Sequence, residues 1–250
     1  MIIGHERQQK FFDKLMKAGE LSGSYIFFGE SETGKFSFAE SIAKRLEPDS
    51  RTLTELLVVR PDEKDSIGID AARRIKRFLS EKPVNAGVRS VIIDEAESLT
   101  SQAENALLKI AEEPPEKSLI MMIVRNPDTL LPTLVSRFRK IYFSRVESDK
   151  IAVWLEKEKG ISVAAAKAAA ASSFGRPGLA LRIAEKNIGV PEELESLADY
   201  RAFIKSEIMK LYKDKIKNDE RIRALVRRLY FIEQFNTNKK LQLQAASWTR

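Results

Sequence analysis

The sequence has 250 residues, of which 43% are hydrophobic and 32% charged, and its formal net charge is +7 at neutral pH. This balance is typical of a globular protein, no apolar run is long enough to span a bilayer, and the first residues lack the basic and apolar regions of a secretion signal. The absence of cysteine excludes disulfides and cysteine-ligated zinc, and a single histidine argues against a Ser-His-Asp hydrolase, so we expect a cytoplasmic protein without a membrane partner.

The first half of the chain alternates between strand-like and helix-like segments. Short apolar runs bounded by glycine, proline or charged residues predict five strands, at 24–29, 55–61, 89–94, 118–124 and 140–143. Apolar residues that recur every three or four positions predict helices between them, at 37–46, 68–79 and 100–115. Such alternation is typical of a parallel sheet with helices on its faces, so the predicted fold class is α/β.

The predicted helix 100–115 has signals for both of its ends. Ser101 and Glu104 have the spacing of a capping box, in which each side chain bonds the backbone N–H of the other. Pro114 and Pro115 end the helix, because the residue before a proline disfavours the helical conformation.

From about residue 145 the strand signal ends. Three short helices are predicted, and the first two end at Gly160 and Gly175. The rest of the sequence is charged and helical in pattern. We therefore predict an α/β domain at 1–145, a small helical domain at 146–188 and a helical region at 189–250.

Residues 29–36, GESETGKF, nearly match the phosphate-binding loop pattern G-x-x-x-x-G-K-[ST], and we call them the phosphate loop. Between a strand and a helix, the backbone around Gly29, Thr33 and Gly34 would hold phosphate groups, and Lys35 would reach the outer phosphates. The alternative is a glycine-containing turn without a ligand.

Two residues of the phosphate loop depart from the pattern. The hydroxyl that normally follows the lysine ligates Mg²⁺, and Phe36 cannot replace it. Glu32 adds a carboxylate to a loop that receives anions.

Two carboxylates, Asp94 and Glu95, follow the predicted strand 89–94. In a phosphate-binding fold, this position holds the carboxylate that binds Mg²⁺ and the base that orients water. A solvated turn or a helix cap would explain the pair equally well if it occurred alone. Together with the phosphate loop, the pair favours a nucleotide-binding architecture and leaves open whether the site works.

Several stretches resemble the AAA+ clamp-loader family, in particular its delta-prime branch in bacterial DNA polymerase III. They are IIGHERQQKFFDKL at 2–15, VIIDEAESLTSQAENALLKIAEEPPEKSLIMMIV at 91–124, NPDTLLPTLVSRFRKIYF at 126–143 and FGRPGLALRIAE at 174–185. The resemblance covers about residues 1–187, and ENALLKIAEEPPE is its most specific part.

The resemblance implies an AAA+ domain at 1–145, a three-helix lid at 146–188 and a helical collar at 189–250 that is short for the family. It also implies a hetero-oligomer with clamp-loader ATPase subunits and a delta-type subunit, which loads the sliding clamp onto primed DNA. The zinc module of many family members would need cysteines, so no metal is expected here.

The arginine of the family's Ser-Arg-Cys motif falls on Arg137, with Phe138 in place of the cysteine. The resemblance implies that Arg137 acts in trans, as an arginine finger that reaches the ATP of a neighbouring subunit. Without the resemblance, an exposed arginine after a short helix begun by Pro132 would be the preferred interpretation.

Three ATP-handling positions of the family are altered together: Phe36, Arg125 at the first sensor and Gly178 at the second. The resemblance thus implies a non-catalytic subunit that requires no cofactor, although Lys35 and Asp94 leave weak binding of ATP and Mg²⁺ open. One alternative is an active, divergent AAA+ ATPase of the motor-subunit type. Another is a stand-alone DNA-binding adaptor that uses the positive charge.

Overall fold

The structure, a computed structural model, describes residues 2–47, 54–83 and 87–185, together with isolated positions after residue 204. The chain divides into two compact units, Met1–Ala184 and Glu185–Arg250. Nearly all of the predicted region 189–250 lies outside the described residues. The boundaries predicted at 145/146 and 188/189 stay predictions.

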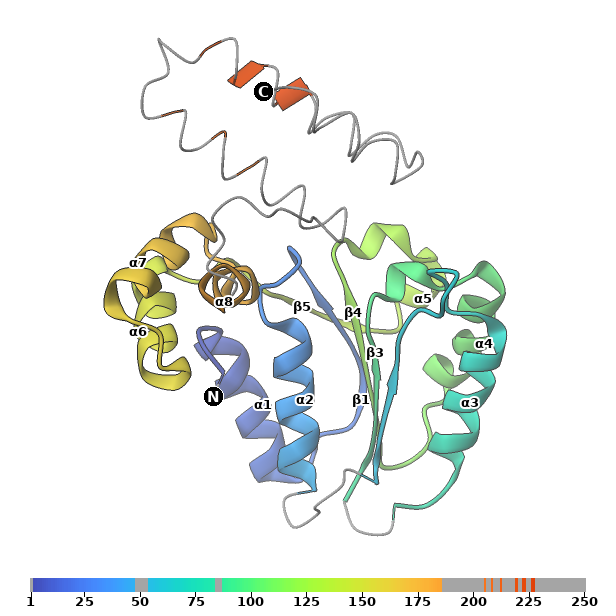
Figure 1. The fold of residues 1–250 in the computed structure, drawn as a ribbon. Helices are drawn as coiled ribbons and strands as arrows, with labels where there is room; N and C mark the ends of the chain where they lie inside the picture. Colours follow the sequence, from blue (N-terminus) through green and yellow to red (C-terminus); the bar gives the residue numbers. More distant parts are fainter. Residues whose placement is uncertain are drawn as a thin grey trace. The chain divides into compact units, whose positions relative to one another are not determined.

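The described residues form one sheet of five parallel strands in the order β2-β3-β4-β1-β5 (Figure 1). The strands are β1 (Gly23–Phe28), β2 (Leu56–Val59), β3 (Arg89–Ile93), β4 (Ser118–Val124) and β5 (Arg139–Tyr142). Every residue of β3 and β4 is buried, as expected for central strands with helices over both faces. The predicted α/β class with a parallel sheet is confirmed.

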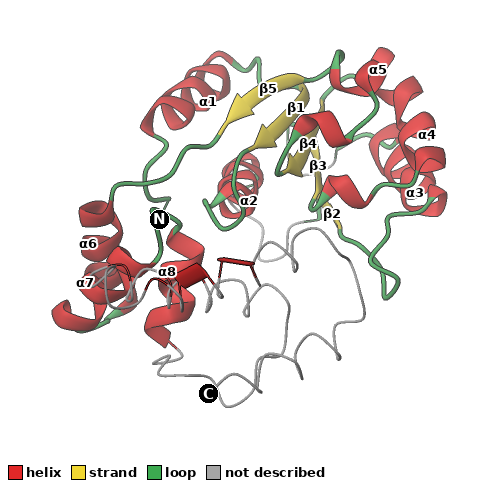
Figure 2. Cartoon of the chain, turned by 90° about the horizontal axis from the view of Figure 1, so that it is seen from above, coloured by secondary structure: helices red, strands yellow, loops and turns green. Residues whose placement is uncertain are grey.

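Helices cover the sheet on both faces, as the views from the side and from above show (Figures 1 and 2). One face carries α1 (Glu6–Ala18) and α2 (Lys35–Leu46), and the other carries α3 (Ile69–Ser80), α4 (Ser101–Glu112) and α5 (Pro132–Val135). Two 3-10 helices, η1 (Ala96–Ser98) and η2 (Pro127–Thr129), follow β3 and β4.

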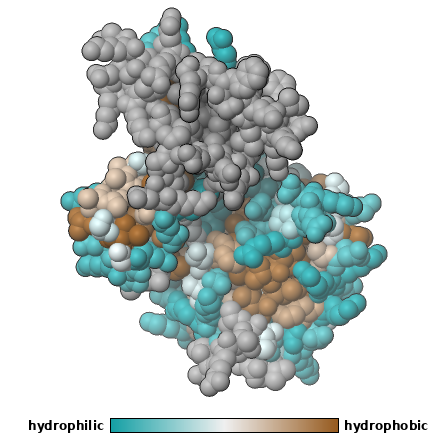
Figure 3. All heavy atoms as spheres, in the orientation of Figure 1, coloured by the Kyte–Doolittle hydropathy of each residue, from teal (hydrophilic) through white to brown (hydrophobic). Residues whose placement is uncertain are grey.

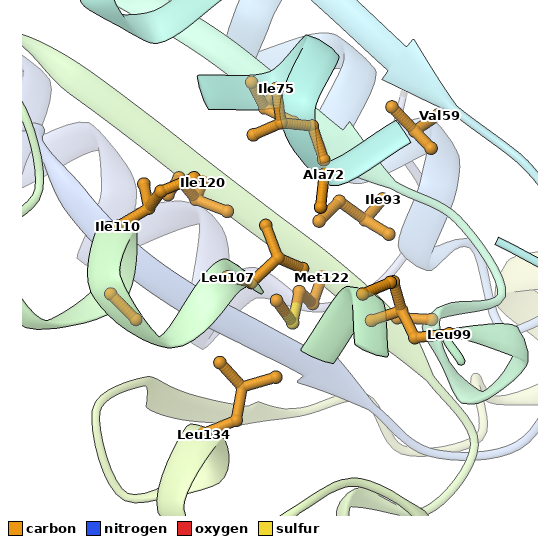
Figure 4. Packing of buried hydrophobic residues seen from close by; sticks show 14 of the residues in the cluster. Val59, Ala72, Ile75, Ile93, Leu99, Leu107, Ile110, Ile120, Met122 and Leu134 are labelled. Carbon is orange, nitrogen blue, oxygen red and sulfur yellow. The ribbon is translucent and has the colours of Figure 1, made fainter. Parts of the chain in front are cut away.

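The two faces have separate hydrophobic cores because side chains alternate along each strand. On β4, Ile120 and Met122 pack with α3 and α4, whereas Leu119 and Met121 pack with α1 and α2. Figure 4 shows the first core, in which Leu134 of α5 belongs to the same cluster as residues of α4 and β4. This core therefore ties α5 to the α4 side of the sheet.

Arg89, at the start of β3, is the centre of a polar network in which Arg89 and Glu55 are buried and Glu81 is exposed. Its guanidinium lies 2.9 Å from a carboxylate oxygen of Glu55 and 2.8 Å from one of Glu81. It also donates to the carbonyl of Phe78 at 2.9 Å and lies over the ring of that residue. Because Glu55 precedes β2 and Phe78 belongs to α3, this one side chain joins three elements.

The two edges of the sheet differ in character. Apolar side chains gather on the surface where β2 lies (Figure 3), and Leu56, Leu57 and Val58 of β2 are half-buried. At the opposite edge, Arg139 and Lys140 of β5 are exposed. Charged side chains at an edge strand oppose pairing with further strands.

After the sheet, the described residues form α6 (Ser148–Lys159), α7 (Val163–Ser172) and α8 (Pro177–Glu185). Their own core includes Ile151, Leu155 and small side chains of α7 and α8. The glycine after α6, Gly160, has a φ of 66°, the left-handed conformation that ends many helices. Among the described helices, none has the length and apolar character that crossing a membrane requires.

The predicted capping box of α4 is wrong. Thr100, not Ser101, is the N-cap, and its hydroxyl accepts a hydrogen bond from the N–H of Ala103 at 3.3 Å. Glu104 therefore lies one position too late to reach back to the N-cap. Its buried carboxylate instead accepts from the N–H of Leu131 at 2.6 Å, which fixes the segment before α5 to α4.

Candidate functional site

The phosphate loop connects β1 to α2 at the carboxyl end of the sheet. Gly29 has a φ of 134°, and a Cβ at this residue would lie 2.3 Å from the carbonyl oxygen of Phe143. Its N–H donates to the carbonyl of Arg125 at 3.2 Å. The loop therefore begins at a position that only glycine fits, between the ends of β4 and β5.

Lys35 is buried and is bonded to the phosphate loop itself. Its ammonium donates to the carbonyls of Gly29 at 2.8 Å and Glu30 at 2.5 Å. The hydroxyl of Thr33, which is also buried, donates to Glu30 as well, at 2.9 Å. Hydrogen bonds within the loop thus hold the Lys35 ammonium, the group that the sequence pattern assigns to the outer phosphates.

Burial lowers the pKa of Lys35 to about 8, against the partly opposing effect of nearby carboxylates, mainly Glu97 and Asp94. Since the ordinary pKa is 10.5, the unfolded chain holds this proton more firmly than the folded chain between pH 8 and 10.5. We expect Lys35 to contribute a rise in unfolding free energy of about 3 kcal/mol as the pH increases across this window.

The measurement is urea unfolding at pH 8 and at pH 10.5 for the wild type and for Lys35→Met. The part of the pH dependence due to Lys35 should be missing in the variant, and Lys14→Met, at an exposed position, should behave as the wild type. An unchanged pH dependence in Lys35→Met would contradict a lowered pKa.

Arg60, directly after β2, lies between the two positions that would ligate Mg²⁺. Its guanidinium carbon lies 4.5 Å from the ring centre of Phe36, and its Nε lies 3.4 Å from a carboxylate oxygen of Asp94. Asp94 also accepts from the N–H of Glu95, whose own side chain is exposed. A cation already neutralises Asp94, and Phe36 offers no ligand, so these residues do not fit Mg²⁺.

The two sensor positions are also bonded within the chain. Arg125, at the end of β4, donates through Nε to a carboxylate oxygen of Glu97 at 2.9 Å. At the second position, the N–H of Gly178 donates to the carbonyl of Glu32 at 3.0 Å. A Cβ at Gly178 would lie 3.1 Å from the Cβ of Glu32, so the close approach of α8 to the loop favours glycine there.

Arginines hold the carboxylates of the phosphate loop. Arg145 donates to both oxygens of Glu30, with contacts of 2.7 to 3.1 Å. Arg182 of α8 lies 2.6 Å from a carboxylate oxygen of Glu32. The departure seen at Glu32 thus has a structural reason, because this carboxylate and Glu30 attach the loop to the segment that follows the sheet.

Sequence reasoning missed Arg60, Arg145 and Arg182. Arg145 and Arg182 lie more than a hundred residues from their partners, and no local spacing indicates the pairing. Arg60 has no clear signal either, because the predicted strand 55–61 includes this residue and sequence spacing does not show that this strand pairs with β3.

His5 is buried beside the phosphate loop. Its Nε2–H donates to the carbonyl of Thr33 at 2.8 Å, and its ring centre lies 4.7 Å from that of Phe143. Burial is the main cause that lowers its pKa. The N-terminal segment therefore supports the loop from inside.

Arg137 lies in a different part of the molecule from Lys35 and Asp94. It follows α5, which belongs to the layer on the other face of the sheet from α2. Its guanidinium donates to the carbonyl of Thr133 and to a carboxylate oxygen of Glu112, both at 2.5 Å. About a third of the side chain, 32%, is exposed, so the guanidinium is accessible from outside the chain.

Comparisons with known proteins identify relatives of this chain. A family model described as DNA polymerase III, delta subunit matches residues 4–147. The delta' subunit of DNA polymerase III from Escherichia coli is 38% identical over 120 residues, which are 48% of this chain and 36% of the relative. The tau subunit from Bacillus subtilis is 28% identical over 166 residues, which are 60% of this chain and 30% of the relative. The chain spans about a third of the length of these two relatives.

Two solved structures have a similar fold. A gamma subunit-related protein of DNA polymerase III from Thermotoga maritima is 22% identical with a TM-score of 0.57, over 94% of this chain and 96% of that one. The RuvB branch migration motor of the same organism is 20% identical with a TM-score of 0.59, over 73% of this chain and 61% of that one. At such identities the likeness concerns the fold alone, which is that of an α/β domain followed by helices.

Proposed function

This chain belongs to the DNA polymerase III delta subunit family, and from that membership we propose that it is a clamp-loader subunit that does not hydrolyse ATP itself. It works in the cytoplasm with clamp-loader ATPase subunits and a delta-type subunit. Its contribution to catalysis is Arg137, donated to the ATP of a neighbouring subunit. It needs no cofactor of its own, and it meets the sliding clamp and primed DNA through the complex.

One observation carries the proposal that the chain is not an ATPase, and it is the position of Arg60. ATP hydrolysis in this fold depends on a metal ion that a loop hydroxyl and an acidic residue after a strand bind together. Here Phe36 and Asp94 both contact the guanidinium of Arg60. A divalent cation would have to displace the Arg60 guanidinium, which already pairs with Asp94.

The contacts of the phosphate loop support the same conclusion. Lys35 bonds to carbonyls of the loop, and Glu30 and Glu32 pair with arginines. An incoming triphosphate would meet two carboxylates and would have to compete with these bonds. The alternative of an active, divergent ATPase is therefore disfavoured.

Support for Arg137 as an arginine finger comes from its surroundings. Leu134 and Phe138, on either side of it along the chain, are buried in the core of the α3–α4 face. Buried neighbours fix the backbone, while the partly exposed guanidinium lies far enough out to reach another molecule. A planar guanidinium with several donors suits the charge that develops on a transferred phosphoryl group.

We expect the isolated protein to bind ATP weakly, with the same affinity in Mg²⁺ and in EDTA. The reason is that the guanidinium of Arg60 already lies beside Asp94, where a metal ion would bind. Isothermal titration calorimetry with a slowly hydrolysed ATP analogue measures this affinity, and a phosphate-release assay measures turnover by the same preparation.

A motor subunit of the gamma/tau type, titrated under the same conditions, is the matched control and should bind more tightly in Mg²⁺. Affinity that rises in Mg²⁺ and falls in Lys35→Ala, with turnover like that of the motor subunit, would favour the active ATPase instead.

A further inference from the structure

Helix α4 contacts the segment that carries Arg137 at two places, through two carboxylates about two turns apart. Near the start of α4, the buried Glu104 accepts from the backbone N–H of Leu131 at 2.6 Å. At the end of α4, Glu112 accepts from the guanidinium of Arg137 at 2.5 Å. The first contact fixes the backbone before α5, and the second orients the side chain after it.

The two contacts differ in how readily they break. Glu104 is 6% exposed and bonds a backbone group, so nothing in solution competes with it. The side chains of Glu112 and Arg137 are 49% and 32% exposed, so water and other ions reach both. An ion pair with this exposure favours the paired state by only about 1.5- to 5-fold.

We propose that Glu112 is a positioning residue. It holds the guanidinium of Arg137 in an ion pair until a neighbouring subunit binds a nucleoside triphosphate close to it. This inference rests on the proposed function of Arg137 as an arginine finger. Before the nucleotide binds, Glu112 keeps the guanidinium extended along α5 and neutralised. A triphosphate carries several negative charges against the single charge of Glu112, so it displaces the carboxylate when it arrives.

The proposal has a kinetic consequence for the neighbour's ATP site. Holding Arg137 on Glu112 reduces the fraction of subunits whose guanidinium is free, and the apparent affinity for nucleotide falls by that fraction. Removing the charge of Glu112 should therefore lower the KM for ATP by about 2.5- to 6-fold. The kcat at saturating ATP should stay the same, because Arg137 has then left Glu112 in both proteins.

The experiment uses a reconstituted clamp loader in which only the ATPase subunit next to this chain keeps its phosphate-binding lysine, so that one site is observed. DNA-stimulated ATP hydrolysis is measured against ATP concentration for the wild type, Glu112→Gln and Glu113→Gln. Glu113 is the adjacent, exposed carboxylate, and its variant should match the wild type. The ratio of the KM values of wild type and Glu112→Gln should approach one at high salt, because salt screens an exposed ion pair.

Arg137→Ala, alone and combined with Glu112→Gln, completes the set. In the Arg137→Ala background the Glu112 change should have no effect, because its partner is missing. If Arg137→Ala itself leaves hydrolysis unchanged, the proposed function of Arg137 is wrong. If Arg137→Ala is defective but Glu112→Gln leaves KM unchanged or lowers kcat, the role given to Glu112 is wrong and that of Arg137 survives.

Discussion

We expect Arg137→Ala to lower ATP hydrolysis at the neighbouring subunit's site by about 10³- to 10⁵-fold, the range that removal of an arginine finger causes. The guanidinium offsets negative charge that develops as the phosphoryl group is transferred, and alanine offers no donor. The loss should appear mainly in kcat, and the KM for ATP should rise as well because bound ATP also engages the guanidinium before hydrolysis. The assay is hydrolysis by the reconstituted complex with a single active site, stimulated by the clamp and primed DNA.

Folding should change little, because the exposed pair of Arg137 with Glu112 contributes on the order of 1 kcal/mol or less. The urea midpoint of the isolated variant checks this. Arg137→Lys is the informative second variant, since an ammonium keeps the charge but loses the planar set of donors, and we expect most of the defect to persist. Arg74→Ala, at an exposed arginine of α3, is the matched control. Full activity of Arg137→Ala would show that the finger lies elsewhere.

The second large effect is expected on stability, in Arg89→Ala. The guanidinium of Arg89 is the shared partner of Glu55, Glu81 and the carbonyl of Phe78. Removing it leaves the buried carboxylate of Glu55 without this cation. Losing one partner of a buried ion pair costs about 3–5 kcal/mol, and we expect the unfolding free energy of the α/β unit to fall by this amount.

Urea unfolding followed by far-ultraviolet circular dichroism measures the change. Arg73→Ala is the control, because Arg73 pairs with Asp70 on the exposed side of α3, where such a pair contributes about 1 kcal/mol or less. The double variant Glu55→Leu/Arg89→Met should regain much of the lost stability, since both charges are then absent. A single variant as stable as the wild type would mean that Glu55 does not depend on Arg89.

The parts of the fold that were predictable are those specified by local pattern. Strand β4 is seven consecutive apolar or small residues, and α3 places Ile75 and Leu79 on its buried face, so length and periodicity were sufficient. The start of α4 was not predictable to the residue. Thr100 and Ser101 are both good N-caps, and the bond from Leu131 to Glu104, which removes Glu104 from any capping box, is a tertiary contact.

The candidate site was predictable as a set of departures from a pattern but not as an arrangement. Phe36 alone indicated that a metal ligand was missing. Arg60 lies beside Phe36 and Asp94 because β2 pairs with β3. Sequence spacing does not encode this pairing. Likewise, Glu32 looked only like an obstacle to phosphate until its partner Arg182 was located. The role of Arg137 in trans stays a prediction.

The contacts of Glu30 with Arg145, of Glu32 with Arg182 and of Gly178 with the loop have a consequence for cell physiology. They join the phosphate loop to the segment after the sheet and to α8 through bonds within the chain. The subunit should thus keep one shape whether adenylate pools are charged or depleted.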